Sequence, residues 1–207
     1  MIKLAVVVVG SYLLGSVPFG FLIAKIAGID IRMSGSGNIG ATNVVRVLGK
    51  RYGFPVFVLD FLKGFAAVKI SMVMATGPLS QWNSPGLSGT MAAIACVIGH
   101  SYPIWLKFKG GKGVATSAGA LFALVPTAGG IGVAVWLITF YATRYVSVAS
   151  VIAAVSFPLI ILAISSHNED VRPIFYFSAG IAAIVVWRHR SNISRLMRGT
   201  EPRFKRK

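Results

Sequence analysis

The chain has 207 residues, of which 55% are hydrophobic and only 13% charged, and its mean hydropathy is +0.74. This composition is typical of integral membrane proteins and excludes an ordinary soluble domain. The net charge of +16 comes from 21 basic and 5 acidic residues, which predicts basic cytoplasmic loops facing anionic lipid or anionic substrates. The basic residues cluster only in short loops and the tail, which argues against nucleic acid as a partner.

The apolar N-terminal segment, residues 4–27, is long enough for a transmembrane helix, since a span needs about 20 apolar residues. It exceeds the apolar core of a signal peptide, and no A-x-A site follows it. Pro18 is expected to bend this helix. The single cysteine, Cys96, excludes an internal disulfide, and no Cys/His cluster predicts a metal site.

Four later apolar runs predict further spans, at residues 52–76, 86–106, 146–164 and 173–187. The first of them contains Asp60 and Lys63, which are costly in lipid and must face the bundle interior or an interface. Because they are three residues apart, they can pair on one helix face. We expect a structural ion pair here in preference to a catalytic one.

The remaining apolar stretch, residues 114–143, is too long for one span, because thirty residues make a helix of about 45 Å. It forms either one long kinked span or two short ones joined near Pro126. The positive-inside rule decides in favour of two, because the basic segments 28–51, 107–113 and 188–207 then all face the cytoplasm. We therefore predict an all-α, polytopic membrane protein with seven transmembrane helices, two of them short.

This topology places the N-terminus outside and the C-terminus in the cytoplasm. The chain is short of polar stretches long enough for a second domain, so we expect one membrane domain over residues 1–207 with a basic tail from about residue 190. The three polar, basic segments then converge on one face. Such convergence suits chemistry between a water-soluble reactant and a lipid-soluble one.

The first polar segment, residues 34–50, contains a G-x-G-x-x-G pattern. A dinucleotide site is rejected, because that pattern needs a preceding strand and a βαβ unit, whereas a membrane helix precedes it here. A glycine-rich loop remains, with hydrogen-bonding groups on Ser36, Asn38, Thr42 and Asn43. Arg46 offers a guanidinium that fits phosphate bidentately.

The second segment, FKGGKGVATS at residues 108–117, lies between two apolar runs. It is not a P-loop, because Gly113 stands where that motif needs Ser or Thr after the lysine. Backbone amides of the glycines, Lys112 and the start of a helix at Val114 form a plausible anion site. The alternative is a basic cytoplasmic loop without a ligand.

The third segment, WRHRSNISRLMRGTE at residues 187–201, follows the last span. If it continues as a helix, His189 and Asn192 share a face, as do Asn192 and Arg195. On composition alone we favour a basic membrane-surface helix that binds anionic lipid.

Longer motifs in these segments resemble a known family. GSGNIGATNVVRVLGK, GHSYPIWLKFKGGKGVAT and HRSNISRLMRGTE are similar to the three cytoplasmic motifs of the bacterial acyl-phosphate:glycerol-3-phosphate acyltransferases, the PlsY family. GSVPFG, DFLKG and RYVS resemble the family too, so the likeness covers nearly the whole chain in order. Motifs of this length are far more specific than a lone G-x-G-x-x-G.

The resemblance implies transfer of a fatty acyl group from acyl phosphate to the 1-hydroxyl of glycerol 3-phosphate, which gives lysophosphatidic acid and phosphate. This is the first acylation of phospholipid synthesis, and it implies a multi-pass protein of the bacterial inner membrane with a cytoplasmic active site. We expect a monomer that needs no cofactor. The H-x4-D pair of other glycerol-phosphate acyltransferases is missing after each histidine.

The resemblance also implies the site residues. Those expected around glycerol 3-phosphate are Ser36, Arg46, Lys112, His189 and Asn192, and the last four are the candidate catalytic residues. Those expected around the acyl phosphate are Gly110, Gly111, Lys112, Gly113, Thr42, Asn43 and Ser150, with Ser147 as a further neighbour.

The residues show no Ser-His-Asp arrangement, and an acyl phosphate is already activated. We therefore expect direct attack by the substrate hydroxyl, without an acyl-enzyme. The candidate bases are His189, His100 and the substrate's own phosphate, of which we favour the last. A transporter of a phosphorylated solute and a structural lipid-binding protein are the alternatives. The polar groups cluster on one face and no inverted repeat is seen, which argues against a transporter.

Overall fold

A computed structural model describes residues 2–76, 85–164 and 172–204. The described residues form helices and turns, and no strand occurs among them. The chain divides into two compact units, Met1–Leu124 and Val125–Lys207. The all-helical class predicted from the sequence is confirmed for the described part of the chain.

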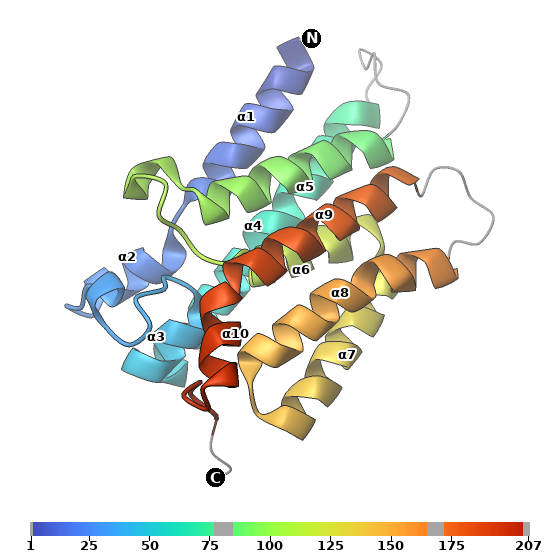
Figure 1. Ribbon diagram of the computed structural model, residues 1–207. Helices are drawn as coiled ribbons and strands as arrows, with labels where there is room; N and C mark the ends of the chain where they lie inside the picture. The colour runs from blue at the N-terminus through green and yellow to red at the C-terminus, as the bar shows by residue number, and fades with distance from the viewer. Residues whose placement is uncertain (1, 77–84, 165–171, 205–207) are drawn as a thin grey trace. The chain divides into compact units, whose positions relative to one another are not determined.

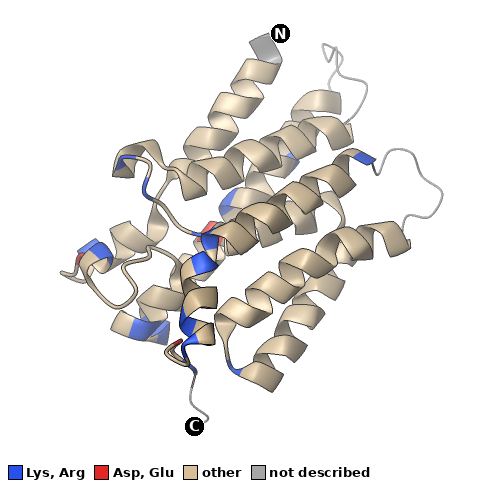
Figure 2. Cartoon of the chain, in the orientation of Figure 1, with Lys and Arg blue, Asp and Glu red and all other residues tan. Residues whose placement is uncertain are grey.

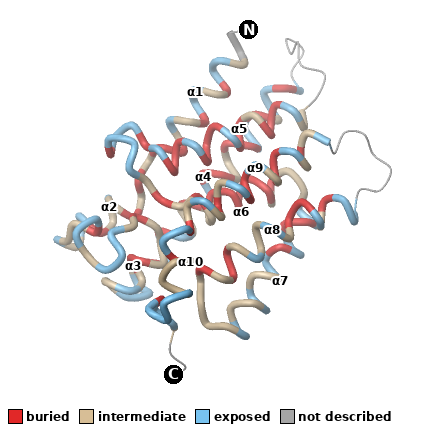
Figure 3. Tube along the Cα trace, in the orientation of Figure 1, coloured by how far each residue is buried: buried red, intermediate tan, exposed pale blue. Residues whose placement is uncertain are grey.

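The first unit holds the helices that surround the first two polar segments (Figure 1). They are α1 (Ile2–Ser16), α2 (Phe19–Ile26), η1 (Ile31–Met33), α3 (Ala41–Leu48), α4 (Lys50–Thr76), α5 (Pro85–Ser101), η2 (Ile104–Leu106) and α6 (Val114–Leu124). Helix α4 is the central element, because it packs against α3, α5 and α6, while α1 lies along α5. Figure 3 shows that α5 and α6 are largely buried, as expected for inner helices of a bundle.

The second unit holds α7 (Pro126–Thr143), α8 (Val146–Ile164), α9 (Arg172–Arg188) and α10 (Arg190–Met197). Helix α8 packs against both α7 and α9, and α10 continues from the end of α9. Helices α5, α7 and α8 carry no Lys, Arg, Asp or Glu, so they stay uncoloured in Figure 2. Such uncharged helices suit a hydrocarbon environment.

The first predicted span is broken rather than bent. Helix α1 ends at Ser16 and α2 begins at Phe19, because Pro18 between them lacks an N–H and cannot continue the helix. The break leaves the carbonyl oxygen of Val17 outside the regular helical pattern, and it accepts bonds from the amide of Phe19 (3.2 Å) and from Nζ of Lys63 (2.9 Å). A side chain from α4 thus satisfies a carbonyl that the proline exposes.

The predicted ion pair on α4 is confirmed. Nζ of Lys63 lies 2.8 Å from Oδ1 of Asp60, and both side chains are almost fully buried. The two residues are one turn apart on the same face, so they neutralise each other inside the first unit. The structural interpretation of this pair also explains why a span can contain it.

The long apolar stretch after Val114 is divided, as predicted, into two helices that meet at Pro126. Val125 leaves the helical region (φ −138°, ψ 86°), and Pro126 opens α7 at a position where a missing N–H costs nothing. Four segments of the described residues are long and apolar enough to cross a membrane: Leu4–Ile26, Pro85–Leu106, Pro126–Thr143 and Val146–Ile164. The count of seven spans stays a prediction.

The polar segment 28–51, predicted as a loop, contains a short helix, α3. Its inner face buries Asn43 and Val44 against the first unit, while Gly49 ends it with a φ of 88° that only glycine adopts readily. The loop prediction was wrong here, because Val44, Val47 and Leu48 recur at helical spacing within a segment that is otherwise rich in glycine and polar residues. Residues 77–84 and 165–171, which lie between predicted spans, are outside the described residues.

Candidate active site

The first polar segment is shaped by the side chain of Asn43, which is only 2% exposed. Its Oδ1 accepts a hydrogen bond from the amide of Ser36 (2.8 Å). Its Nδ2 lies within bonding distance of three carbonyl oxygens, those of Asn38 (2.9 Å), Ser34 (3.0 Å) and Ile31 (3.4 Å). One amide group therefore organises the whole glycine-rich turn around itself. The structure gives Asn43 a shaping role, and its predicted contact with acyl phosphate stays a prediction.

Ser36 and Arg46 are polar residues of this segment that are exposed at its surface. Arg46 lies in the last turn of α3, and Ser36 lies on the turn that Asn43 holds. Thr42 is half-buried in the first turn of the same helix. Two predicted anion ligands, a hydroxyl and a guanidinium, are thus presented by a rigid turn and a short helix.

The GGKG loop is laid against the end of α5 by backbone hydrogen bonds. The amide of Gly110 bonds the carbonyl of Ser101 (3.2 Å), and the amide of Gly111 bonds the carbonyl of His100 (3.1 Å). Before it, Lys107 and Phe108 both have positive φ, at 52° and 61°, although neither is glycine. Such conformations cost of order 1 kcal/mol or more and concentrate at functional segments.

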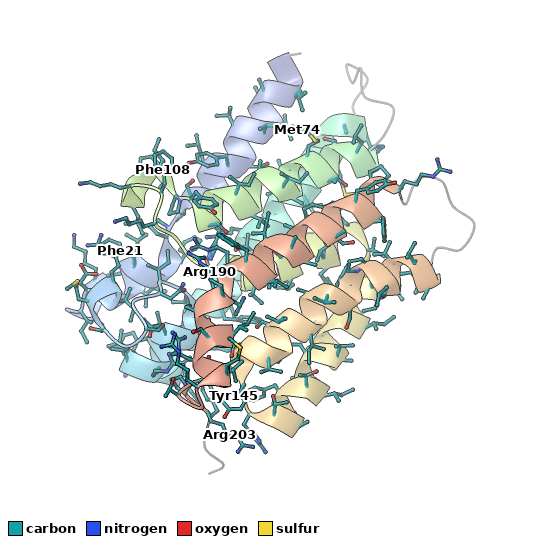
Figure 4. All side chains as sticks on the ribbon, viewed as in Figure 1. Phe21, Met74, Phe108, Tyr145, Arg190 and Arg203 are labelled. Atoms are coloured by element: carbon teal, nitrogen blue, oxygen red, sulfur yellow. The ribbon has the colours of Figure 1, made fainter. Side chains whose placement is uncertain are left out.

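The loop leads directly into α6, which begins at Val114 as predicted. Gly113 turns the chain with a φ of 79°, and its carbonyl accepts the amide of Ser117 (2.7 Å). Lys112 is half-buried, with Gly111 and Gly113 buried on either side. Phe108, labelled in Figure 4, belongs to the exposed approach to this loop. A cation beside a helix N-terminus is a suitable site for a phosphate.

In the second unit, His189 marks the junction of α9 and α10. The ring is 3% exposed, and its Nδ1 lies 2.8 Å from the carbonyl of Val185. Since a carbonyl oxygen only accepts, this contact places a proton on Nδ1, and the neutral ring then carries its basic lone pair on Nε2. The helix is interrupted at His189 alone, and the carbonyl of His189 still accepts the amide of Ile193 (2.9 Å).

Asn192 is held by Glu201, a residue not predicted to belong to the site. Asn192 Nδ2 donates to Oε1 of Glu201 (2.6 Å), to which the hydroxyl of Ser147 also donates (2.8 Å). Arg195 Nε donates to Oε2 (2.8 Å). Burial alone would raise the pKa of Glu201, but these three donors outweigh it and hold the pKa below its ordinary value. Glu201 is the one acid in a basic tail, which was the signal available in the sequence.

Glu201 reaches these partners because α10 ends in a Schellman motif. The amide of Gly199 (φ 68°) bonds the carbonyl of Leu196, and the amide of Thr200 bonds the carbonyl of Arg195 (2.8 Å). This geometry turns the chain back along α10 and presents Glu201 to the helix.

The tail beyond Glu201 docks on the turn between α7 and α8. Arg203 Nε donates to the carbonyl of Thr143 (3.1 Å), and its guanidinium lies 5.7 Å from the ring centre of Tyr145. Both Arg203 and Tyr145 are labelled in Figure 4. The amide of Phe204 bonds the carbonyl of Arg144 (3.1 Å).

The predicted site residues divide between the two compact units. The first unit contains Ser36, Thr42, Asn43, Arg46, Gly110, Gly111, Lys112 and Gly113, and the second contains Ser147, Ser150, His189 and Asn192. Within the second unit, Ser147 and Asn192 are brought together on Glu201. Ser150 instead accepts a hydrogen bond from the indole of Trp136 (3.2 Å), and its predicted contact with acyl phosphate stays a prediction.

Known proteins similar to this chain share nearly its full length. A family model described as glycerol-3-phosphate acyltransferase matches residues 5–199. Proteins named glycerol-3-phosphate acyltransferase from Desulforamulus reducens and Aquifex aeolicus are 46% and 45% identical to it. The matches cover 97% and 98% of this chain, and 94% and 100% of those relatives.

Two crystal structures of PlsY (YgiH), an integral membrane glycerol 3-phosphate acyltransferase, resemble the fold at 44% sequence identity. The glycerol 3-phosphate form gives a TM-score of 0.86 over 98% of this chain and 96% of that one. The lysophosphatidic acid form gives 0.83 over 98% and 95%. The family resemblance inferred from the motifs is confirmed.

Replacing Asn43 by aspartate should disorder the first loop, because a carboxylate turns its Oδ2 toward three carbonyl oxygens that now bond an N–H donor. We expect faster hydrogen exchange at the Ser36 amide and a lower midpoint of thermal unfolding. Asn38→Asp is the matched control, since Oδ1 of Asn38 only accepts, from the amide of Gly40 (2.8 Å), and a carboxylate retains that bond. Equal effects of the two variants would contradict the role given to Asn43.

The lowered pKa of Glu201 predicts a pH-dependent tail. Because the folded-state pKa lies below the ordinary value of 4.5, ionised Glu201 stabilises the fold above that pH, and the contribution is lost as the pH falls through the folded-state pKa. Glu201→Gln should therefore unfold at a lower temperature than the wild type near neutral pH. The difference in unfolding temperature between the two proteins should disappear as the pH falls below 4.5. An equal difference at neutral and at acidic pH would show that the charge on Glu201 plays no part.

Proposed function

Because this chain belongs to the glycerol-3-phosphate acyltransferase family, we propose an acyl phosphate as its donor and the two sets of site residues above as its substrate contacts. The chain is a membrane acyltransferase that acylates glycerol 3-phosphate to lysophosphatidic acid, the first acylation of phospholipid synthesis. Membership of this family removes the reason to favour a transporter or a structural lipid-binding protein.

The observation that carries the donor proposal is the GGKG loop. Its backbone is hydrogen-bonded to the end of α5, and Lys112 provides a cation. The N-terminus of α6 comes directly after the loop, at Val114. These features favour an oxyanion-rich group such as the phosphoryl end of an acyl phosphate. The phosphate is also the leaving group, so Lys112 and the amides at the N-terminus of α6 stabilise the charge that develops on it. The amides of Gly110 and Gly111 are bonded to α5 and hold the loop in place.

For the acceptor, we assign glycerol 3-phosphate to Ser36, Arg46, Lys112, His189 and Asn192. Arg46 is exposed at the end of a short helix and can bind a phosphate through two parallel bonds. The amide of Asn192 is oriented by Glu201, and His189 presents its basic nitrogen on Nε2. Asn192 and His189 are held by hydrogen bonds within their own unit before any ligand arrives, which lowers the ordering cost of binding.

The reaction is a direct displacement at the acyl carbon. The 1-hydroxyl oxygen of glycerol 3-phosphate bonds to the carbonyl carbon, the bond from that carbon to the phosphate oxygen breaks, and phosphate leaves. The hydroxyl proton passes to the phosphate group of the same glycerol 3-phosphate molecule. His189 is the alternative acceptor; His100 is disfavoured, because its ring lies between Asp60 and the backbone of Gly111.

We further propose seven spans, an outer N-terminus, a cytoplasmic C-terminus and an active site on the cytoplasmic side of the bacterial inner membrane. The support is the distribution of Lys and Arg among the polar segments. The two helices around Pro126 are what this topology requires. We expect a monomer in a single membrane domain, without a cofactor.

The donor is tested by incubating purified protein with glycerol 3-phosphate and either palmitoyl phosphate or palmitoyl-CoA. We expect phosphate release that needs both substrates, lysophosphatidic acid as the product, and no product from the CoA donor. Product from palmitoyl-CoA alone would overturn the donor proposal and leave the acyltransferase assignment intact.

Lys112→Ala and Arg46→Ala should each reduce kcat/KM by a factor of about 10² or more, the scale seen when one group that stabilises developing charge is removed. Lys109→Ala is the matched control, because it removes the same charge from an exposed position of the same loop. We expect less than about a threefold change there, as for most exposed single charges. A similar loss in all three variants would point to general electrostatic attraction of anions instead of specific contacts.

A further inference from the structure

A second polar group lies beneath the GGKG loop, inside the first unit. It consists of Asp60, Lys63 and His100, called the buried trio here. Oδ1 of Asp60 lies 2.8 Å from Nζ of Lys63 and 3.5 Å from Nδ1 of His100. The three side chains are only 4%, 2% and 5% exposed. The transfer chemistry proposed above uses none of them.

The trio is anchored on several elements. Asp60 and Lys63 belong to α4, and His100 belongs to the last turn of α5. Lys63 also donates to the carbonyl of Val17 at the break between α1 and α2. Cys96 Sγ on α5 donates to the carbonyl of Lys63 (3.6 Å). The imidazole of His100 is therefore flanked on one side by a carboxylate that Lys63 holds in place.

The other side of the same imidazole faces the loop. A Cβ built on Gly111 would lie 2.0 Å from Nε2 of His100 and 2.8 Å from its Cε1, so the ring packs directly on the loop backbone. The amides of Gly110 and Gly111 bond the carbonyls of Ser101 and His100. One residue of α5 thus contacts the loop through both its ring and its carbonyl.

Burying a charge is costly unless it is paired, and apolar residues of similar volume are often no less stabilising than a buried ion pair. A purely structural core has no need of a carboxylate, an ammonium and an imidazole at this place. The polar partners give the His100 ring a defined orientation, because polar contacts are directional. Apolar packing alone would restrict the rotation of the ring less.

We propose that His100 is a positioning residue for the acyl donor: Asp60 orients its ring, and the ring sets the position of Gly111 and hence of Lys112. This inference rests on the proposed function, since it assigns the loop to the donor phosphate. The reacting groups need to be placed to within about 1 Å, and an error of that size can cost a factor of 10² in rate. The trio supplies that placement from inside the membrane bundle.

The contact between the His100 ring and Gly111 is tested by enlarging the side chain at position 111 and shortening the one at position 100. Gly111→Ala should reduce kcat/KM for palmitoyl phosphate by about 10²-fold, through a higher KM for this substrate, because the new methyl meets a ring that cannot move. His100→Ala should reduce it less, by about 10-fold. The double variant Gly111→Ala/His100→Ala should recover at least about 10-fold over Gly111→Ala, because the methyl then occupies space that the ring has left.

The neighbouring glycine gives the matched control. A Cβ on Gly110 would lie 2.2 Å from the carbonyl oxygen of His100 and 2.4 Å from Cδ of Pro103, and truncation of the His100 side chain removes neither atom. The double variant Gly110→Ala/His100→Ala should therefore be no more active than Gly110→Ala. Recovery in both pairs, or in neither, would overturn the proposal.

Two further measurements distinguish failure of this proposal from misfolding of a variant and from a wrong choice of donor. The midpoint of thermal unfolding is measured for every variant, and rates are compared only for folded protein. If His100→Ala does not fold, His100→Asn replaces it, since its amide can still face Asp60 while the outer part of the ring is gone. If wild-type protein uses palmitoyl-CoA in place of palmitoyl phosphate, the donor proposal fails, and the same four-variant comparison is made with the CoA donor.

Discussion

The ammonium of Lys63 connects the parts of the first unit on which the rest of the structure depends. It lies between the carboxylate of Asp60 at 2.8 Å and the carbonyl of Val17 at 2.9 Å, with almost no exposure. The carbonyl is available only because Pro18 breaks the first span, and Asp60 is tolerated in an apolar helix only because Lys63 neutralises it. Removing one partner of such a pair typically lowers the free energy of unfolding by about 3–5 kcal/mol. The helix break, the ion pair and the helix contacts therefore depend on one another.

Close approach of the helices around this pair depends on glycine. A Cβ on Gly64 of α4 would lie 2.1 Å from the carbonyl oxygen of Thr116, and one on Gly119 of α6 would lie 1.9 Å from that of Phe61. Helices in lipid gain little from apolar burial against each other, so backbone contact through small residues supplies much of their packing energy. The helix that starts at the GGKG loop is thereby held against the helix that carries the ion pair.

The polar motifs follow a common design: a buried polar side chain shapes each one. Asn43 organises the turn that presents Ser36, His100 lies beneath the GGKG loop, and Glu201 orients Asn192. The residues assigned to substrates are thus positioned by neighbouring polar side chains of the protein. Such preorganisation is the main way in which a protein of few titratable groups can stabilise a charged transition state.

Much of this could be predicted from the sequence, and the remainder depends on contacts distant in the chain. The Asp60–Lys63 pair, the helix start at Val114 and the division at Pro126 follow from local spacing and backbone chemistry, and all three are confirmed. The role of Glu201 was missed, because its partner Ser147 is 54 positions away and spacing rules do not extend that far.

The shaping roles of Asn43 and His100 are not visible from residue type alone. The family resemblance places Asn43 near the acyl phosphate, and the fold adds that its amide bonds the loop itself. His100 was one of three candidate bases, and the fold adds that its ring is buried against Gly111. Hydrogen-bonding capacity is visible in a sequence, whereas whether the protein itself uses that capacity is visible only in the fold.

The central claim is that both substrates are bound together and that the acyl group passes directly between them. Isotope exchange tests it most directly: the enzyme is incubated with palmitoyl phosphate and ³²P-labelled phosphate, without glycerol 3-phosphate. Direct transfer predicts that no label enters palmitoyl phosphate, because the acyl–phosphate bond breaks only when the acceptor hydroxyl attacks. Labelled palmitoyl phosphate, or an acyl group trapped on a Ser, Thr or Cys, would demonstrate an acyl-enzyme and contradict this mechanism.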